Sequence, residues 1–205
     1  MDILCCTSRP IGRVLVIHSW WGLTRSFHDY AAQLAAEGFT VGSSDLFGGQ
    51  TASDIEGARR LRRLPRRIPM YKSLIADIET LLAFEAPAPR EVAIVGFSMG
   101  GHWAVWLSQQ PGLPIRSTVL YYAARGGNFA ASTSSYLAHF AQNDPWVSAS
   151  ARRGMERALT RAGRSYAAHD YPGTGHWLAE ADRSQDYDAE AAALALQRTV
   201  SHLRG

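Results

Sequence analysis

A serine between two glycines is the strongest chemical signal in the sequence. Gly96, Ser98 and Gly100 form the pattern G-x-S-x-G, which follows an apolar run at residues 92–95 and precedes a helix-like stretch. In a turn sharp enough to join strand to helix, side chains at both glycine positions would collide with neighbouring backbone. The serine hydroxyl is thereby exposed, so the pattern predicts Ser98 as a nucleophile. The alternative, tight strand–helix packing alone, is disfavoured because the motif has the required element on both sides.

A helix that begins at the serine would also supply hydrogen-bond donors. Its free amides and the positive end of its dipole point toward a negative charge formed at Ser98. The N–H group of Met99 is therefore the first candidate donor of an oxyanion hole.

A serine hydroxyl is a weak nucleophile until a base takes its proton, and seven histidines are available. His176 lies in a glycine-rich segment just after the last predicted strand, where a base could reach over the serine. His18 ends the first predicted strand, and we expect it to shape the neighbouring loop by hydrogen bonding. The remaining histidines lie inside predicted helices or strands, where structural roles are usual: His28, His102, His139, His169 and His202.

The acid that orients the base should lie between Ser98 and His176, because α/β-hydrolases have the order Ser, acid, His. Asp144 follows a predicted strand in a turn, where a carboxylate can orient an imidazole and stabilise its cation. Asp170 is the rival, but it ends the strand whose loop delivers the histidine. Asp45 is expected to be a turn or helix-cap residue. We therefore predict Asp144 as the acid.

The elements that must position these residues alternate along the chain. Short apolar runs bounded by Gly, Pro, Asp or Asn alternate with longer amphipathic stretches, which indicates a parallel sheet with crossover helices on both faces. Ligands in such sheets bind at the carboxyl ends of the strands, which is where the candidate residues lie. Six strands are predicted at residues 13–18, 39–43, 91–97, 117–122, 136–141 and 165–170, and helices at 26–37, 51–64, 71–84, 100–110, 148–162 and 188–203.

Composition favours a soluble globular protein. The 205 residues fit one domain, residues 1–205, and 46% are apolar against 19% charged, as in a packed core rather than a disordered chain. The apolar runs are strand-length, shorter than the roughly 20 residues of a membrane span. The N-terminus lacks the pattern of a secretory signal, so a cytoplasmic protein is expected.

Cysteines and charge indicate no metal, cofactor or nucleic acid. Cys5 and Cys6 are adjacent, which suits neither a disulfide between distant segments nor a metal site. The net charge is only +3. A run of arginines at residues 59–67 could attract an anionic substrate, although such runs are more often solvated helix faces, and it lacks the interleaved aromatics of a nucleic-acid groove.

Taken together, these stretches resemble the dienelactone hydrolase family from about Val14 to His202. The supporting segments are residues 16–23, 36–39, 45–47, the serine turn, 140–145 and the tail at 187–199. The resemblance implies an α/β-hydrolase fold without a large cap domain. It also implies that the amide of Trp20 is the second oxyanion donor, beside Met99.

Three positions depart from the family pattern. Family members typically have cysteine where Ser98 stands, and a glutamate that manages the thiol where Ser19 stands. The absence of both the cysteine and the glutamate is chemically coherent, because a serine has no thiolate to suppress. It favours Ser-His-Asp esterase chemistry. Dienelactone-cleaving members have an arginine four positions past the histidine, where this chain has Glu180, so the substrate is expected to differ.

The resemblance also predicts an exposed edge. The two strands that precede the first one in the family have no predicted counterpart ahead of residue 13. The strand at residues 39–43 would then lie at the edge of the sheet, open to pairing with another subunit.

All six tryptophans lie near the candidate residues in sequence. Trp103 and Trp106 are three apart on a predicted helix and are expected to face the core. For the others, an aromatic pocket and simple packing remain equally good interpretations. The predicted substrate-binding residues are Ser19, Trp21, Trp146 and Trp177.

The function predicted is hydrolysis of a small carboxylic ester or lactone through an acyl-enzyme, by a monomer or homodimer without cofactor, membrane or nucleic-acid partner. Acyl transfer by the same triad is the nearest alternative. A catalytically silent fold that binds a small apolar ligand is an alternative from another class, and a third is anion or nucleic-acid binding through the arginine run.

Overall fold

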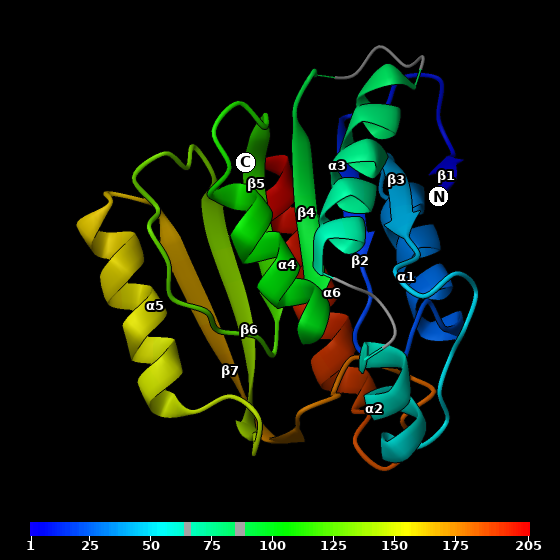
Figure 1. Cartoon of the computed structure of the whole chain (residues 1–205), viewed down its shortest axis with the longest axis vertical. Coiled ribbons are helices and arrows are strands. Elements are labelled where there is room, and N and C mark those ends of the chain that lie inside the picture. Colours follow the sequence, from blue (N-terminus) through cyan, green and yellow to red (C-terminus); the bar gives the residue numbers. More distant parts are fainter. Residues whose placement is uncertain (64–66, 85–88) are drawn as a thin grey trace.

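Apolar strands and amphipathic helices alternate along the chain and build a mostly parallel sheet with helices on both faces (Figure 1). The computed structural model describes residues 1–63, 67–84 and 89–205. Within these residues seven strands pair in the order β1-β3-β2-β4-β5-β6-β7. They are β1 (Asp2–Cys5), β2 (Gly12–Ile17), β3 (Phe39–Ser44), β4 (Val92–Phe97), β5 (Ile115–Tyr121), β6 (Ser135–Asn143) and β7 (Tyr166–Gly175).

The edge of the sheet differs from the prediction. β1 pairs with β3 in antiparallel register, from Asp2 opposite Ser43 to Cys5 opposite Thr40. Because β3 is therefore an inner strand, the prediction of an exposed edge at residues 39–43 is wrong. The sequence pattern does not reveal β1, because its four residues alternate between exposed and half-buried and contain no buried apolar run. The six predicted strands are all present, and the pairings among these six are all parallel.

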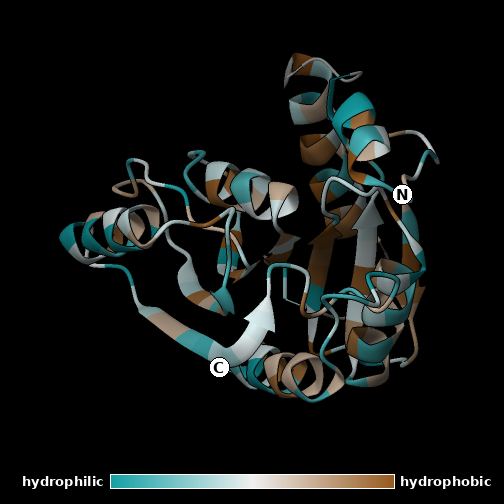
Figure 2. Ribbon diagram, turned by 90° about the horizontal axis from the view of Figure 1, so that it is seen from below, coloured by the Kyte–Doolittle hydropathy of each residue, from teal (hydrophilic) through white to brown (hydrophobic). Residues whose placement is uncertain are grey.

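Helices cover both faces of the sheet. In Figures 1 and 2, α3, α4 and α5 lie on one face and α1 and α6 on the other, without a large cap. Helix α2 lies at the lower end of Figure 1. None of the helices within the described ranges is long and apolar enough to cross a lipid bilayer. The helices are α1 (Arg25–Ala36), α2 (Ile55–Arg63), α3 (Arg67–Ala83), α4 (Met99–Ser108), α5 (Ala149–Arg161) and α6 (Ala189–Arg204).

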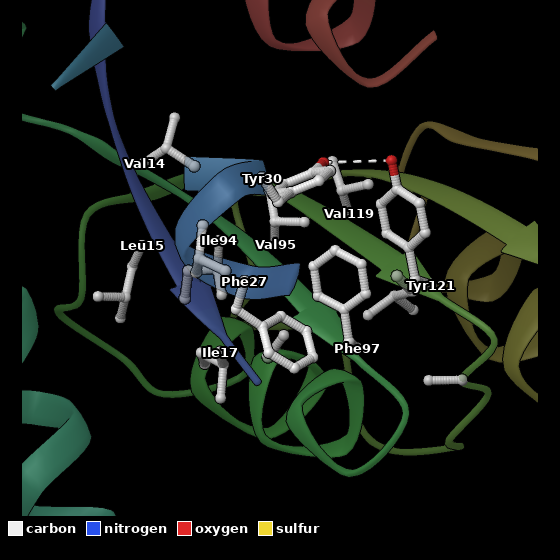
Figure 3. Close-up of a cluster of buried hydrophobic side chains, with 14 of the residues drawn as sticks. Val14, Leu15, Ile17, Phe27, Tyr30, Ile94, Val95, Phe97, Val119 and Tyr121 are labelled. Carbon is white, nitrogen blue, oxygen red and sulfur yellow. Dashed lines mark hydrogen bonds between the residues drawn. The ribbon is translucent and has the colours of Figure 1, made fainter. Parts of the chain in front are cut away.

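The central strands are buried on both sides because each face is covered by helices. Every residue of β2 and of β4 is buried. On one face, Phe27 and Tyr30 of α1 pack at helical spacing against Phe97 of β4 and Tyr121 of β5 (Figure 3). The Tyr30 hydroxyl donates to that of Tyr121 at 3.1 Å, which satisfies a polar atom inside the core.

A glycine packs the start of α4 against the end of β2, and we expect alanine there to destabilise the fold. A methyl group on Gly100 would lie 2.6 Å from the carbonyl oxygen of His18, a backbone atom that cannot move aside. Gly100→Ala should therefore lower the free energy of unfolding by about 3 kcal/mol, measured by chemical denaturation.

Gly154→Ala is the matched control. Nothing lies within 4 Å of a methyl group at Gly154, which is inside α5. This change should raise stability by about 0.5 to 1 kcal/mol, because alanine is the better helix former. Equal stability of Gly100→Ala and the wild type would contradict the close approach of α4 to β2.

Candidate active site

The serine lies on a strained turn between β4 and α4. Ser98 follows the last strand residue, precedes Met99, and has φ 50° and ψ −108°, a conformation rare for a residue with a side chain. A methyl group on Gly96 would lie 2.5 Å from the carbonyl oxygen of Gly100. Both glycines of the motif are thus needed for the turn itself, as the sequence pattern predicts.

The three residues predicted as nucleophile, base and acid are joined by hydrogen bonds. Ser98 Oγ lies 2.8 Å from Nε2 of His176, and Nδ1 of that ring lies 2.8 Å from both carboxylate oxygens of Asp144. A carboxylate only accepts, so Nδ1 carries the proton and Nε2 is the acceptor for the serine hydroxyl. This tautomer is the one that a general base for Ser98 requires.

Asp144 is held from two sides. Its Oδ1 also accepts from the backbone N–H groups of Trp146 at 2.8 Å and Val147 at 3.0 Å, in the loop after β6. The side chains of Asp144 and His176 are only 5% and 4% exposed. The N–H groups of the loop and the imidazole hold the buried carboxylate in one orientation, toward His176.

The other predicted carboxylates lie elsewhere. Asp170 is 60% exposed and pairs with Arg152 at 2.6 Å. Asp45 accepts from the N–H groups of Phe47 at 3.0 Å and Gly49 at 2.5 Å, which is the role of a turn residue. Of the carboxylates considered from the sequence, the structure brings Asp144 to His176.

His18 has the hydrogen-bonding role that its position predicts. It is fully buried, its Nδ1–H donates to the carbonyl of Ser19 at 2.5 Å, and its Nε2 accepts from the N–H of Leu46 at 3.0 Å. Burial lowers the pKa of His18 to about 4. The imidazole is therefore neutral at physiological pH and ties the loop after β2 to the loop after β3.

The two candidate oxyanion donors lie beside the serine. Trp20 follows β2 and Met99 opens α4, and both line the same hollow as Ser98. Among the described residues no acceptor is found for the amide of either. Two unused N–H groups on the wall of one hollow are what stabilisation of an oxyanion requires, and their role stays a prediction.

The hollow around Ser98 has a volume of about 190 Å³ and an aromatic wall. Trp20 and Trp177 are buried and stack with ring centroids 6.2 Å apart, whereas Trp146 is 48% exposed at the mouth, 5.1 Å from Trp20. These tryptophans pack on one another and also line the hollow, and their contact with a substrate stays a prediction. The wall is formed by Trp20, Arg62, Ser98, Met99, His102, Tyr122, Trp146, Val147, His176 and Trp177.

Two of the predicted substrate-binding residues do not line this hollow. Trp21 faces a larger neighbouring hollow of about 650 Å³, where the guanidinium of Arg183 lies 4.3 Å above its ring. Trp177 lines both hollows and separates them. Ser19 is fully buried and its hydroxyl donates to Glu180, so its position does not support substrate contact.

Four wall residues were not predicted: Arg62, His102, Tyr122 and Val147. A usable signal existed for two of them, because His102 lies one helical turn after Ser98 and Tyr122 follows β5 at the carboxyl edge of the sheet. Burial, and then the positive charges of Arg125 and Arg62, lower the pKa of His102 to about 4. His102 is thus neutral at physiological pH.

The arginine run is only partly described. Residues 59–63 belong to α2, where Arg60 pairs with Glu56 at 2.9 Å, and residues 64–66 lie outside the described ranges. Trp103 and Trp106, expected to face the core, are half-buried and pack against it, and Trp106 also packs on Tyr71 with ring centroids 4.3 Å apart. Among the described residues no group of three or more histidine, cysteine or acidic side chains could hold a metal ion.

Comparison with known proteins decides the family. The sequence model of the dienelactone hydrolase family matches residues 5–205. The chain belongs to the dienelactone hydrolase family. The resemblance read from the motifs is therefore confirmed, and hydrolase chemistry with it.

Relatives of this dienelactone hydrolase family member agree over most of its length. A candidate carboxymethylenebutenolidase of Synechocystis sp. is 26% identical over 206 residues, which cover 90% of this chain and 82% of the relative. A candidate dienelactone hydrolase of Klebsiella pneumoniae superposes with a TM-score of 0.80 at 20% identity. The match covers 95% of this chain and 87% of that one. A dienelactone hydrolase-like promiscuous phosphotriesterase from metagenomic libraries gives a TM-score of 0.80 at 20% identity. The match covers 95% of this chain and 86% of that one. The structures support the α/β-hydrolase fold.

Proposed function

We propose that the protein hydrolyses small carboxylic esters or lactones, with Ser98 as nucleophile, His176 as general base and Asp144 as the acid. The observation that carries this proposal is the unbroken chain of 2.8 Å hydrogen bonds from the serine hydroxyl through the imidazole to the carboxylate. Membership of a hydrolase family and the serine at the strained turn support it further.

The mechanism follows from the direction of these hydrogen bonds. Ser98 Oγ attacks the carbonyl carbon while Nε2 of His176 takes its proton, and the carbonyl oxygen becomes an oxyanion that the amides of Met99 and Trp20 stabilise. Collapse expels the alkoxide, which receives the proton from His176 and leaves an acyl-serine. Water, deprotonated by the same imidazole, then attacks the acyl carbon and releases the acid and the serine.

The wall of the hollow indicates the class of substrate. A volume of about 190 Å³ suits a short acyl chain or a single ring, and three tryptophans favour an apolar or aromatic group. The position where dienelactone-cleaving members carry an arginine holds Glu180, which is buried and turned to other partners. We therefore propose a small apolar or aryl ester rather than a dienelactone.

Removing the tryptophan at the mouth should weaken substrate binding. Trp146→Ala is expected to raise KM for phenyl acetate about tenfold with little change in kcat, because an aromatic contact of about 1.4 kcal/mol is lost while the triad stays intact. Initial rates over a range of substrate concentrations measure this. Leu194→Ala, which removes an apolar side chain 41% exposed on α6, should leave KM unchanged.

The direct test of the proposed reaction is product analysis. The protein is incubated with p-nitrophenyl acetate, with and without methanol, and acetate and methyl acetate are quantified. Hydrolysis predicts acetate as the main product in both mixtures. Methyl acetate in excess would instead assign acyl transfer, and no turnover of any activated ester would favour a fold that only binds a ligand.

A further inference from the structure

One buried carboxyl joins the three segments that form the candidate site. Glu180 is fully buried in the segment after β7, four residues beyond His176. The hydroxyl of Ser19, in the loop after β2, donates to its Oε2 at 2.8 Å. The hydroxyl of Tyr122, at the end of β5, donates to its Oε1 at 2.8 Å. The mechanism assigns no role to this group.

Each hydrogen-bond partner of Glu180 adjoins a residue that the proposed mechanism uses. Ser19 directly precedes Trp20, and its hydroxyl also accepts from the N–H of Trp21 at 3.4 Å. Tyr122 lies with its ring centroid 4.9 Å from that of His176 and has φ 40°, an unfavourable conformation that its neighbours must hold. Through Ser19 and Tyr122, the Glu180 carboxyl is therefore connected to the loop that carries Trp20 and to the ring that lies against His176.

We propose that Glu180 is a positioning residue which, as a neutral carboxyl, holds the Trp20 loop and Tyr122 in their working places, and that its ionisation lowers activity in alkaline solution. This inference rests on the proposed function. A hydroxyl can also accept, so a neutral carboxyl that donates one of the two hydrogen bonds and accepts the other can satisfy both hydroxyls without a charge. A carboxylate would place a negative charge beneath the loop where the oxyanion must form.

The surroundings keep the carboxyl protonated at neutral pH. Burial raises the pKa of Glu180 to about 8, against the lowering effect of the Tyr122 and Ser19 hydroxyls. Asp182 raises this pKa further and Arg183 lowers it, both from the same segment. Tyr122, which hydrogen-bonds to Glu180, is uncharged at this pH because burial raises the pKa of its hydroxyl.

Glutamine in place of Glu180 mimics the neutral carboxyl. Glu180→Gln should keep kcat at pH 7 within about threefold, because the amide donates one hydrogen bond and accepts the other, and its activity should not decline above pH 8 as that of the wild type does. Glu180→Leu removes both hydrogen bonds and should lower kcat about 30-fold at pH 7, with KM changed less than about threefold. A profile for Glu180→Gln that matches the wild type would overturn the proposal.

Tyr122→Phe gives a second test through the same carboxyl. It removes a hydroxyl that stabilises the carboxylate, so the alkaline decline should move to higher pH. An unmoved decline would contradict the assignment to Glu180. Circular dichroism checks that each variant folds.

Stability provides a readout that does not depend on activity. The unfolded chain releases the Glu180 proton near pH 4.5, whereas the folded protein keeps it to about pH 8. The free energy of unfolding should therefore fall with rising pH across this window, and the fall should be smaller in Glu180→Gln. The same slope in both proteins would overturn the proposal, whereas this stability difference in a protein without esterase activity would refute only the proposed function.

Discussion

Ser98→Ala is expected to lower kcat for p-nitrophenyl acetate by about 10,000-fold, because no other group on the wall of the hollow can form the acyl-enzyme. The remaining hydroxyl there, that of Tyr122, hydrogen-bonds to Glu180, whereas the group at Nε2 of His176 is the Ser98 hydroxyl. Release of p-nitrophenol at saturating substrate measures the loss. The folded state should be retained, because alanine removes one oxygen from a half-buried site.

Ser148→Ala is the matched control for that loss. Ser148 caps α5, accepts from the N–H of Ala151 at 3.2 Å and does not line the hollow. Its loss should cost about 1 kcal/mol of stability and leave kcat unchanged. Retention of more than a tenth of wild-type activity by Ser98→Ala, with contaminating esterase excluded, would remove the serine from the mechanism.

Asp144→Asn is expected to lower kcat by about 1,000-fold or more with a smaller effect on KM. Asparagine is nearly isosteric but neutral, and it can turn its amide N–H toward Nδ1 of His176, which favours the wrong tautomer. It also cannot stabilise the imidazolium that forms when the serine proton is taken. Steady-state rates from pH 6 to pH 9 with p-nitrophenyl acetate measure the loss.

Asp170→Asn separates the two candidate acids. Asp170 lies on the surface in an ion pair with Arg152, and exposed pairs contribute about 1 kcal/mol at most. The variant should keep the kcat of the wild type. A large loss in Asp170→Asn together with a small loss in Asp144→Asn would reverse the assignment of the acid.

Pattern alone predicts the elements that are most buried. The apolar runs of β2 and β4 have few other interpretations, because a strand covered on both faces must be apolar at every position. Helix starts are less predictable. A helix was expected from residue 51, but Asp54 accepts from the N–H of Gly57 at 2.7 Å as a cap does, and α2 begins at Ile55.

The candidate site is predictable where chemistry constrains the residue type. Serine, histidine and aspartate must occur in a given order at the ends of strands, so roles for Ser98, His176 and Asp144 could be predicted from motif and topology. The contact between Ser19 and Glu180 could not. These positions read as two separate departures from the family pattern, and only the structure brings them within 2.8 Å across 161 residues of chain.

Covalent labelling with a fluorophosphonate, followed by peptide mapping, tests the central claim most directly. The reagent reacts with a serine hydroxyl only when a base activates it, so one adduct per chain is expected, on Ser98, with little reaction in His176→Ala. An adduct on another residue, or equal labelling of Ser98 without the imidazole, would contradict the claim that His176 activates Ser98.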